Sequence, residues 1–166
     1  MVNNDLALLV GWIAFIFGLS GYLIKNKRQL SLVFGAVSFI WALHFYLLGG
    51  VTASFIQVGM GIRTWFSISL YQNKQLETVY IITTSVVFLL LMSFTWQGVL
   101  STIPTIAAIN STIAYTRDNA IMRYMFLLSS LLWIINALLI SSMPSVLVEC
   151  FAIVFNLLGI LRLLKK

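Results

Sequence analysis

Length, composition and charge together exclude a soluble protein. The chain has 166 residues, of which 61% are hydrophobic and only 8% are charged. A soluble domain carries about 25% charged residues, so this chain could not cover its own surface in water. The composition predicts an all-α integral membrane protein. The net charge of +6 does not indicate nucleic-acid binding, because the basic residues stand at the ends of apolar runs.

Seven apolar runs with very short connections follow one another along the chain, each long enough to cross a hydrocarbon core of roughly 30 Å. They are Leu6–Ile24, Leu30–Leu48, Val51–Tyr71, Thr78–Thr95, Gly98–Tyr115, Ile121–Ile140 and Pro144–Leu164. Only Trp96 and Gln97 separate the fourth and fifth runs, and Pro104 could kink or break the fifth. A six-helix fold is therefore the main alternative.

The distribution of basic residues distinguishes these two folds. With seven helices and the N-terminus outside, every Lys and Arg except Arg63 falls on the inner side. The inner set is Lys25, Lys27, Arg28, Lys74, Arg117, Arg123, Arg162, Lys165 and Lys166. Such a one-sided distribution follows the positive-inside rule, whereas six helices would divide the basic residues between the two sides. We expect seven transmembrane helices with the N-terminus out and the C-terminus in.

A shift of about 92 residues superimposes the first three runs on the last three, which indicates an internal repeat. Few residues are identical, but spans, charges and polar positions agree. The matched pairs are Trp41 with Trp133, His44 with Asn136, Gln57 with Glu149, and Thr64 with Asn156. Because a single linker helix separates the halves, they run in the same direction. We expect a parallel 3+1+3 arrangement, with a first bundle over residues 1–73, a linker helix over 74–97 and a second bundle over 98–166.

Two charged residues lie within the apolar runs. Arg63 stands about twelve residues, or roughly 18 Å, from the outer end of its run, where an arginine costs about 2.5–3.5 kcal/mol. It either extends to the inner surface or faces the bundle interior toward an anionic or carbonyl group. Glu149 is the one acidic residue inside a run. We expect it to pair with His44 or Arg63 as a proton-linked or solute-contacting group, a purely structural polar clamp being the alternative.

Amide side chains at similar depths predict a polar cavity. Glu149 and Asn156 are seven residues apart and share a helix face, as do Gln57 and Thr64. Asn110 lies at nearly the depth of Asn156. Converging amides suit recognition of hydroxyl or amide groups, although each could instead make a hydrogen bond between helices worth about 0.6 kcal/mol.

Trp41 and Trp133 lie deeper than interface anchors do, at matched positions, and could stack on a flat ring or a sugar face or simply pack. The predicted solute-binding residues are Trp41, His44, Gln57, Arg63, Asn110, Trp133, Asn136, Glu149 and Asn156.

The sequence lacks the residues that several chemical functions require. The single cysteine, Cys150, can form neither an internal disulfide nor a cysteine-rich metal site, and one histidine cannot ligate haem twice. No metalloprotease, serine-hydrolase or nucleotide-binding motif occurs. We therefore expect no cofactor, no metal and no enzymatic activity.

With these positions set out, the chain resembles the YgjV-type family of bacterial inner-membrane proteins over nearly its whole length. The residues that carry the resemblance are His44, Phe45, Leu47, Leu48, Gly49, Gly50, Thr52, Ala53, Arg63, Trp133, Asn136, Ser142, Glu149 and Arg162. The resemblance implies a multi-pass protein of the bacterial inner (plasma) membrane.

The 3+1+3 layout is also similar to sugar transporters of the SWEET type and nicotinamide riboside transporters of the PnuC type. SWEET proteins carry a proline in the first helix of each half. Pro104 fits that pattern, but Trp12 stands at the equivalent place in the first half, which puts a sugar-specific function in doubt. Asn156 falls where these families place a binding asparagine, and its counterpart here is Thr64.

The sequence thus predicts an inner-membrane transporter or facilitator of a small polar solute, such as a sugar, nucleoside or vitamin-like molecule, working by alternating access. Its expected partners are that solute and the lipid bilayer, with no nucleic acid; self-association into a homo-oligomer is left open. The alternative is a non-transporting membrane scaffold or partner-binding protein. Its interior would be sealed, with Arg63 and Glu149 fully paired.

Overall fold

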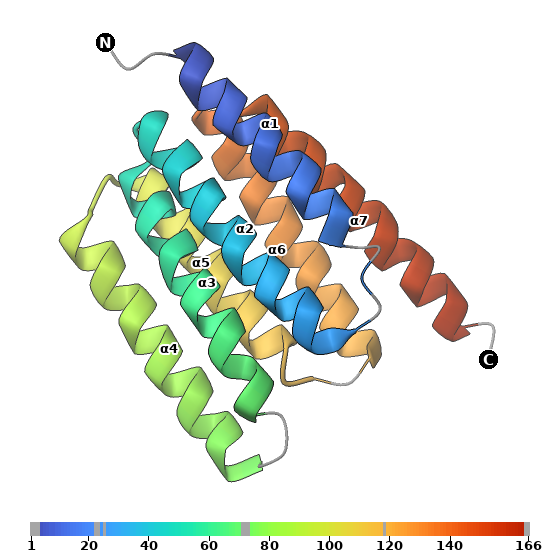
Figure 1. The fold of residues 1–166 in the computed structure, drawn as a ribbon. Helices are drawn as coiled ribbons and strands as arrows, with labels where there is room; N and C mark the ends of the chain where they lie inside the picture. The colour runs from blue at the N-terminus through green and yellow to red at the C-terminus, as the bar shows by residue number, and fades with distance from the viewer. Residues whose placement is uncertain (1–3, 22–23, 25, 71–73, 118, 165–166) are drawn as a thin grey trace.

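The computed structural model describes residues 4–21, 24, 26–70, 74–117 and 119–164, which form seven helices (Figure 1). They are α1 (Asn4–Gly21), α2 (Lys27–Leu47), α3 (Val51–Leu70), α4 (Lys74–Phe94), α5 (Val99–Ala114), α6 (Asn119–Leu139) and α7 (Met143–Leu164). The seven-helix prediction is confirmed. The six-helix alternative is wrong, because α4 and α5 are separate helices and α5 continues through Pro104. The predicted span end at Tyr71 and the basic residues Lys25, Lys165 and Lys166 lie outside the described residues.

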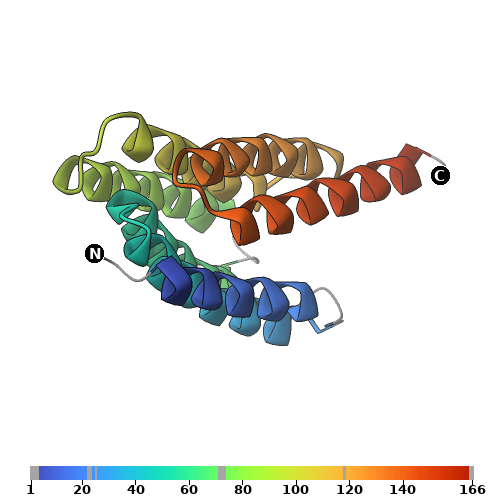
Figure 2. The ribbon, with the colours of Figure 1, turned by 90° about the horizontal axis from the view of Figure 1, so that it is seen from above.

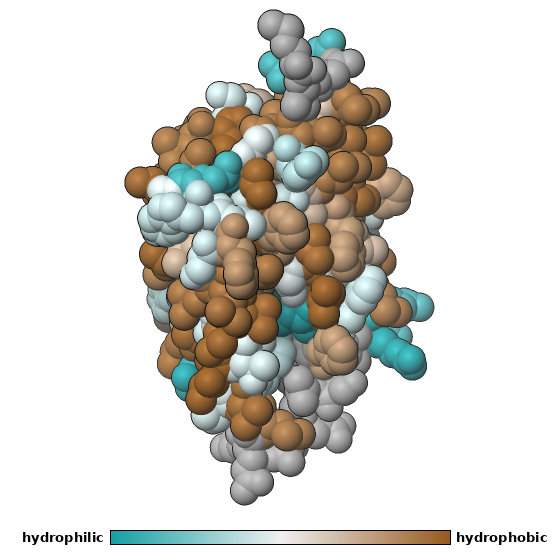
Figure 3. Space-filling model, turned by 90° about the vertical axis from the view of Figure 1, so that its left-hand side faces the viewer, coloured by the Kyte–Doolittle hydropathy of each residue, from teal (hydrophilic) through white to brown (hydrophobic). Residues whose placement is uncertain are grey.

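Counted over the described residues, five helices are long and apolar enough to cross a membrane, namely α1, α2, α4, α6 and α7. α5 is an apolar helix of 16 residues, or roughly 24 Å, and α3 carries Gln57 and Arg63. Large apolar side chains cover much of the exposed surface, and the side seen in Figure 3 is mostly hydrophobic. The protein is therefore a multi-pass membrane protein, and a full crossing by α3 and α5 stays a prediction.

The helices form two groups of three with α4 at their edge. α1 packs on α2 and α2 on α3, while α5 packs on α6 and α6 on α7. The groups, seen as two layers in Figure 2, meet through α1 with α7 and α3 with α5, and α4 packs on α3 and α5. Among the described residues, the backbones of α2 and α6 do not meet. Side chains of these two central helices therefore line the space between the layers.

The helix ends lie at two opposite ends of the molecule, which differ in the residues they carry. The α2–α3, α4–α5 and α6–α7 turns lie at the upper end of Figure 1, which we call the turn end. The start of α2, the α5–α6 link and the end of α7 lie at the opposite end. Arg28, Arg117 and Arg162 belong to these segments, so we call it the basic end.

The α2–α3 and α6–α7 turns have the same geometry at positions related by the proposed repeat shift. In the first, Gly49 N donates to Tyr46 O and Gly50 N to Phe45 O. In the second, Ser141 N donates to Leu138 O and Ser142 N to Ala137 O. This pair of bonds is a Schellman motif, which needs a left-handed residue after the helix end. Gly49 has φ of 81°, and Ser141, at the matching position, has φ of 57°.

The left-handed backbone gives opposite expectations for these two matched positions. Ser141→Gly should stabilise the protein by roughly 1 kcal/mol, because a side chain in this conformation is strained. Gly49→Ser should destabilise it by a similar amount, although an added Cβ meets no atom within 4 Å. Thermal unfolding of both variants in detergent measures the two effects, and unchanged midpoints in both would contradict the strain.

Candidate functional site

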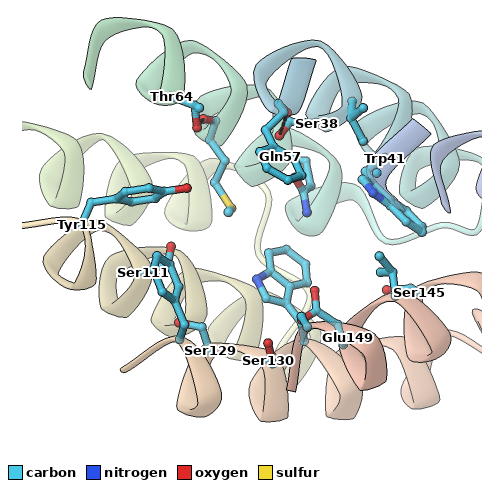
Figure 4. A pocket seen from close by; sticks show the side chains of 18 of the residues that line it. Ser38, Trp41, Gln57, Thr64, Ser111, Tyr115, Ser129, Ser130, Ser145 and Glu149 are labelled. Atoms are coloured by element: carbon cyan, nitrogen blue, oxygen red, sulfur yellow. Dashed lines mark hydrogen bonds between the residues drawn. The ribbon is translucent and has the colours of Figure 1, made fainter. Parts of the chain in front are cut away.

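A cavity of about 530 Å³ lies between the two helix layers. Its lining residues come from every described helix except α4. They run from Trp41, Phe45 and Trp133 toward the turn end to Leu30 and Met122 near the basic end. Figure 4 shows side chains of both layers pointing into this space. The volume lies within the range of pockets for small molecules.

Stacked aromatic rings close the cavity toward the turn end. Phe45 of α2 stacks on Trp133 of α6, with ring centroids 5.6 Å apart and planes 6° apart. Trp41 stacks on the other side of Phe45 at 5.8 Å. All three are buried, and the Phe45–Trp133 contact joins the two layers directly.

His44 forms hydrogen bonds between helices at one side of this closed end. Its ring is fully buried, with Nδ1 2.7 Å from the Ala7 carbonyl of α1 and Nε2 2.7 Å from the Ser142 hydroxyl. Because a carbonyl can only accept, we assign the proton to Nδ1, so Nε2 of the neutral ring accepts from Ser142. Ser142 precedes α7 and also accepts from Ser145 N. One side chain thus ties α1 and α2 to the start of α7.

Thr52 forms hydrogen bonds between helices at the other side of the closed end. Its hydroxyl donates to the Thr95 carbonyl and lies 2.7 Å from the Ser101 hydroxyl. Gln97 adds a bond from Nε2 to the Gly49 carbonyl at 2.9 Å. These contacts join the α2–α3 turn and α3 to the α4–α5 turn and α5. The turn end is therefore sealed by bonded groups on both sides of the aromatic stack.

Arg63 of α3 lies in the cavity wall and is only 4% exposed. Its Nη1 donates to Thr112 Oγ1 at 2.7 Å and to Ser111 Oγ at 3.2 Å, and its Cζ lies 4.9 Å from the centre of the Tyr115 ring. Nε is buried without a hydrogen-bond partner. The side chain faces the bundle interior, as one of the two sequence interpretations expected, and does not extend to the inner surface.

Glu149 of α7 also lines the cavity, opposite α3 (Figure 4). Its carboxyl group faces the hydroxyl of Ser130 on α6. It does not pair with His44, whose ring nitrogens are engaged by Ala7 and Ser142, nor with Arg63, which bonds to hydroxyls. The expected ion pair is thus not formed, because both possible partners are already engaged by neutral groups.

Two amides complete the polar lining. Gln57 is 8% exposed, points into the cavity and makes no hydrogen bond with any described residue. Asn156 donates from Nδ2 to the Ala152 carbonyl of its own helix at 2.9 Å, which leaves its carbonyl oxygen for the cavity. A buried amide without a partner costs about 1–3 kcal/mol. Packing alone therefore does not explain why Gln57 lies in the cavity wall.

The structure brings together some of the predicted site residues and separates others. The cavity-lining members are Trp41, Gln57, Arg63, Trp133, Glu149 and Asn156. Asn110 lies behind the wall, where Nδ2 bonds to Met125 O and Ser129 Oγ and ties α5 to α6. His44 and Asn136 do not line the cavity and are fully buried; the side-chain amide of Asn136 has no partner. Binding of solute by any of these residues stays a prediction.

Arg123 is the cavity residue that sequence reasoning missed. It was assigned to the inner set of basic residues, yet it lies in the first turns of α6 and its side chain lines the cavity. Its position inside the predicted run Ile121–Ile140 was the available signal. Serine hydroxyls of the wall, such as Ser129 and Ser130, carry no sequence signal, because serine is common in membrane helices.

The hydrogen bonds of His44 depend on Gly11 of α1. A Cβ at Gly11 would lie 2.5 Å from His44 Cε1 and 2.7 Å from Nδ1, whereas one at Gly18, on the same helix face, would meet its nearest atom at 3.8 Å. Gly11→Ala should therefore lower stability by about 1–3 kcal/mol, since it displaces a buried, bonded ring. Gly18→Ala should be neutral or stabilise by up to about 1 kcal/mol. Denaturation of both variants in detergent checks this, and equal stabilities would disprove this dependence.

Comparison with known proteins identifies the family to which the chain belongs. The model of the Imp-YgjV family, described as a bacterial inner membrane protein, matches residues 5–166. No curated protein and no solved structure matches the chain. The likeness to the SWEET and PnuC architectures therefore stays a prediction. The family match covers nearly the whole sequence, and the apolar helices agree with it. The chain belongs to the Imp-YgjV family and is a protein of the bacterial inner membrane.

Proposed function

We propose that this protein transports, or facilitates the passage of, a small polar solute across the inner membrane. The observation that carries the proposal is the cavity, which is closed by bonded groups at the turn end and reaches the basic end. Its wall holds an amide that bonds to no described residue, that of Gln57, and three charged residues, Arg63, Arg123 and Glu149, which form no ion pair with one another. Such groups are costly within a membrane bundle unless they face water or a ligand.

The contact pattern of the helices supports two parallel repeats. If α1, α2 and α3 correspond to α5, α6 and α7, the α1–α2 and α2–α3 contacts match α5–α6 and α6–α7. The α1–α7 contact then matches α5–α3, and only α4 has no counterpart. The two Schellman turns add matched hydrogen bonds at the repeat shift. A two-fold axis along the membrane normal accounts for all of these matches.

Alternating access follows from this arrangement. Because basic residues favour the cytoplasmic side, we place the basic end inside and the turn end outside. Under this proposal we interpret the structure as a state open toward the cytoplasm. Rocking of one three-helix group against the other would separate Phe45 from Trp133 and His44 from Ser142, and would close α2 on α6 at the basic end.

Residue roles follow from position in the wall. Gln57 and Asn156 would hydrogen-bond the solute, Trp41 and Trp133 would contact its apolar face, and Arg63 would attract an anionic or carbonyl group. The scaffold alternative predicted a sealed interior with Arg63 and Glu149 fully paired, and the cavity favours the transporter. Uptake of sugars, nucleosides and vitamins into proteoliposomes tests transport directly, preceded by thermal-shift screening of the same compounds.

The proposed inward-open state predicts one-sided access to the cavity. In a Cys150→Ser background, Ser130→Cys places a thiol in the wall, and Ser54→Cys places one outside the cavity at similar burial, the serines being 5% and 7% exposed. A membrane-impermeant thiol reagent should label Ser130→Cys in inside-out vesicles several-fold faster than Ser54→Cys. Labelling in right-side-out vesicles should be slower, because the closed end blocks the path.

The same two cysteine variants can also contradict the proposed access from the basic end. Equal labelling of both variants from the cytoplasmic face would mean that the cavity is not reachable from the basic end. A sealed interior of that kind would support the scaffold alternative.

A further inference from the structure

We infer that the cavity binds an anionic group, a carboxylate or a phosphate, between Arg63 of α3 and Arg123 of α6. This deepens, and rests on, the proposed transport function. Both arginine residues line the same cavity, one from each helix layer, and Arg123 also lines an adjoining pocket with Gly159 and Arg162. In both arginines the Nε atom is buried without a hydrogen-bond partner.

Arg63 is held in place for an incoming anion. Ser111 and Thr112 use their own protons on the Ala108 carbonyl at 2.9 and 2.8 Å, so both hydroxyl oxygens accept from Nη1. The Tyr115 ring lies against the guanidinium. Among the described residues only neutral groups contact the guanidinium, so none of them neutralises its charge. The Nε–Nη2 edge, which binds carboxylate and phosphate in a bidentate manner, donates to no described residue.

Arg123 is held by a backbone surface. Its guanidinium lies over Gly159 of α7, where an added Cβ would come within 2.0 Å of Nη1 and 2.2 Å of Cζ. Any side chain at this position would therefore displace the guanidinium. Arg123 makes no hydrogen bond or ion pair with a described residue. Glycine at 159 thus gives room to a partly buried, positively charged group that bonds to no described residue.

The charge balance of the cavity favours an anion. Among its lining residues the two arginines are accompanied by a single carboxyl group, that of Glu149, which lies beside Ser130 and forms no ion pair with either arginine. An arginine stays protonated in proteins, and an unpaired charge away from water is costly. One anionic group would remove the excess positive charge. The aromatic rings at the closed end then face the rest of the ligand, so we assign a small organic anion with a planar or apolar body.

Matched pairs of probes isolate the charge of the ligand. Acetate and benzoate are compared with acetamide and benzamide, and inorganic phosphate is added, all at constant ionic strength in non-ionic detergent. We expect at least one of the anions to raise the unfolding midpoint by about 3 °C more than its neutral twin or, for phosphate, than the buffer alone. That difference should disappear in Arg63→Gln and Arg123→Gln, and persist in Arg117→Gln, an exposed arginine outside the cavity.

A variant without any charge change separates geometry from general electrostatics. Gly159→Ala should weaken the anion effect several-fold, because it displaces the Arg123 guanidinium. Gly18→Ala, also in the cavity wall, should keep the effect, since its Cβ makes only an ordinary contact. If Arg63→Gln fails to fold, Arg123→Gln and Gly159→Ala still decide the question.

The outcomes distinguish this inference from the transport function. If neutral twins stabilise the protein as well as the anions and protect Ser130→Cys from labelling, the cavity binds solutes and the anion site is wrong. If no probe acts through the arginines and Ser130→Cys is not labelled, the proposed transport function is contradicted as well.

A second experiment compares vesicles of phosphatidylcholine with and without phosphatidylglycerol. An arginine-dependent effect of that lipid alone would confirm the anion site, assign it to a headgroup and overturn the solute.

Discussion

Polar side chains inside a membrane-embedded bundle find no bulk water, so each needs a partner in the protein or a space that solvent or ligand can reach. The molecule meets this constraint differently at its two ends. At the turn end, His44 and Thr52 are engaged by neighbouring helices and seal the aromatic stack. Around the cavity, Gln57 and the Nε atoms of Arg63 and Arg123 bond to no described residue. Asn136, buried outside the cavity, also lacks a partner. We therefore take the gathering of unpartnered groups around one cavity as the basis of the function.

The two halves share a framework and differ in the side chains that give the cavity its chemistry. Backbone turns, helix contacts and the central tryptophans match across the proposed repeat. Arg63 has Phe155 as its counterpart, and Arg123 has Ser31. Each half therefore contributes one guanidinium at a place where the other half has none. A symmetric scaffold with an asymmetric lining suits recognition of a solute that itself has one charged end.

Much of the fold could be predicted because its signals are local, whereas the site depends on packing. Apolar run length predicted seven helices with very short connections, and seven helices are observed in the described residues. The depth of Arg63 left two placements open, extension to the inner surface or burial in the bundle interior, and the second is observed. Sequence could not show that Asn110 bonds to the neighbouring helix and away from the cavity. Nor could it show that Gly159 makes room for Arg123, since that contact joins different helices.

Distances between α2 and α6 at the two ends test alternating access most directly. Leu43 with Ile135 near the closed end, and Leu32 with Tyr124 near the basic end, are exposed, matched pairs on these helices. Spin labels at each pair, in liposomes and with transported solute added, report both distances. We expect opposite changes, with the Leu43–Ile135 distance increasing in the molecules whose Leu32–Tyr124 distance decreases. A single, unchanged distance at both ends under all conditions would contradict a rocking transporter.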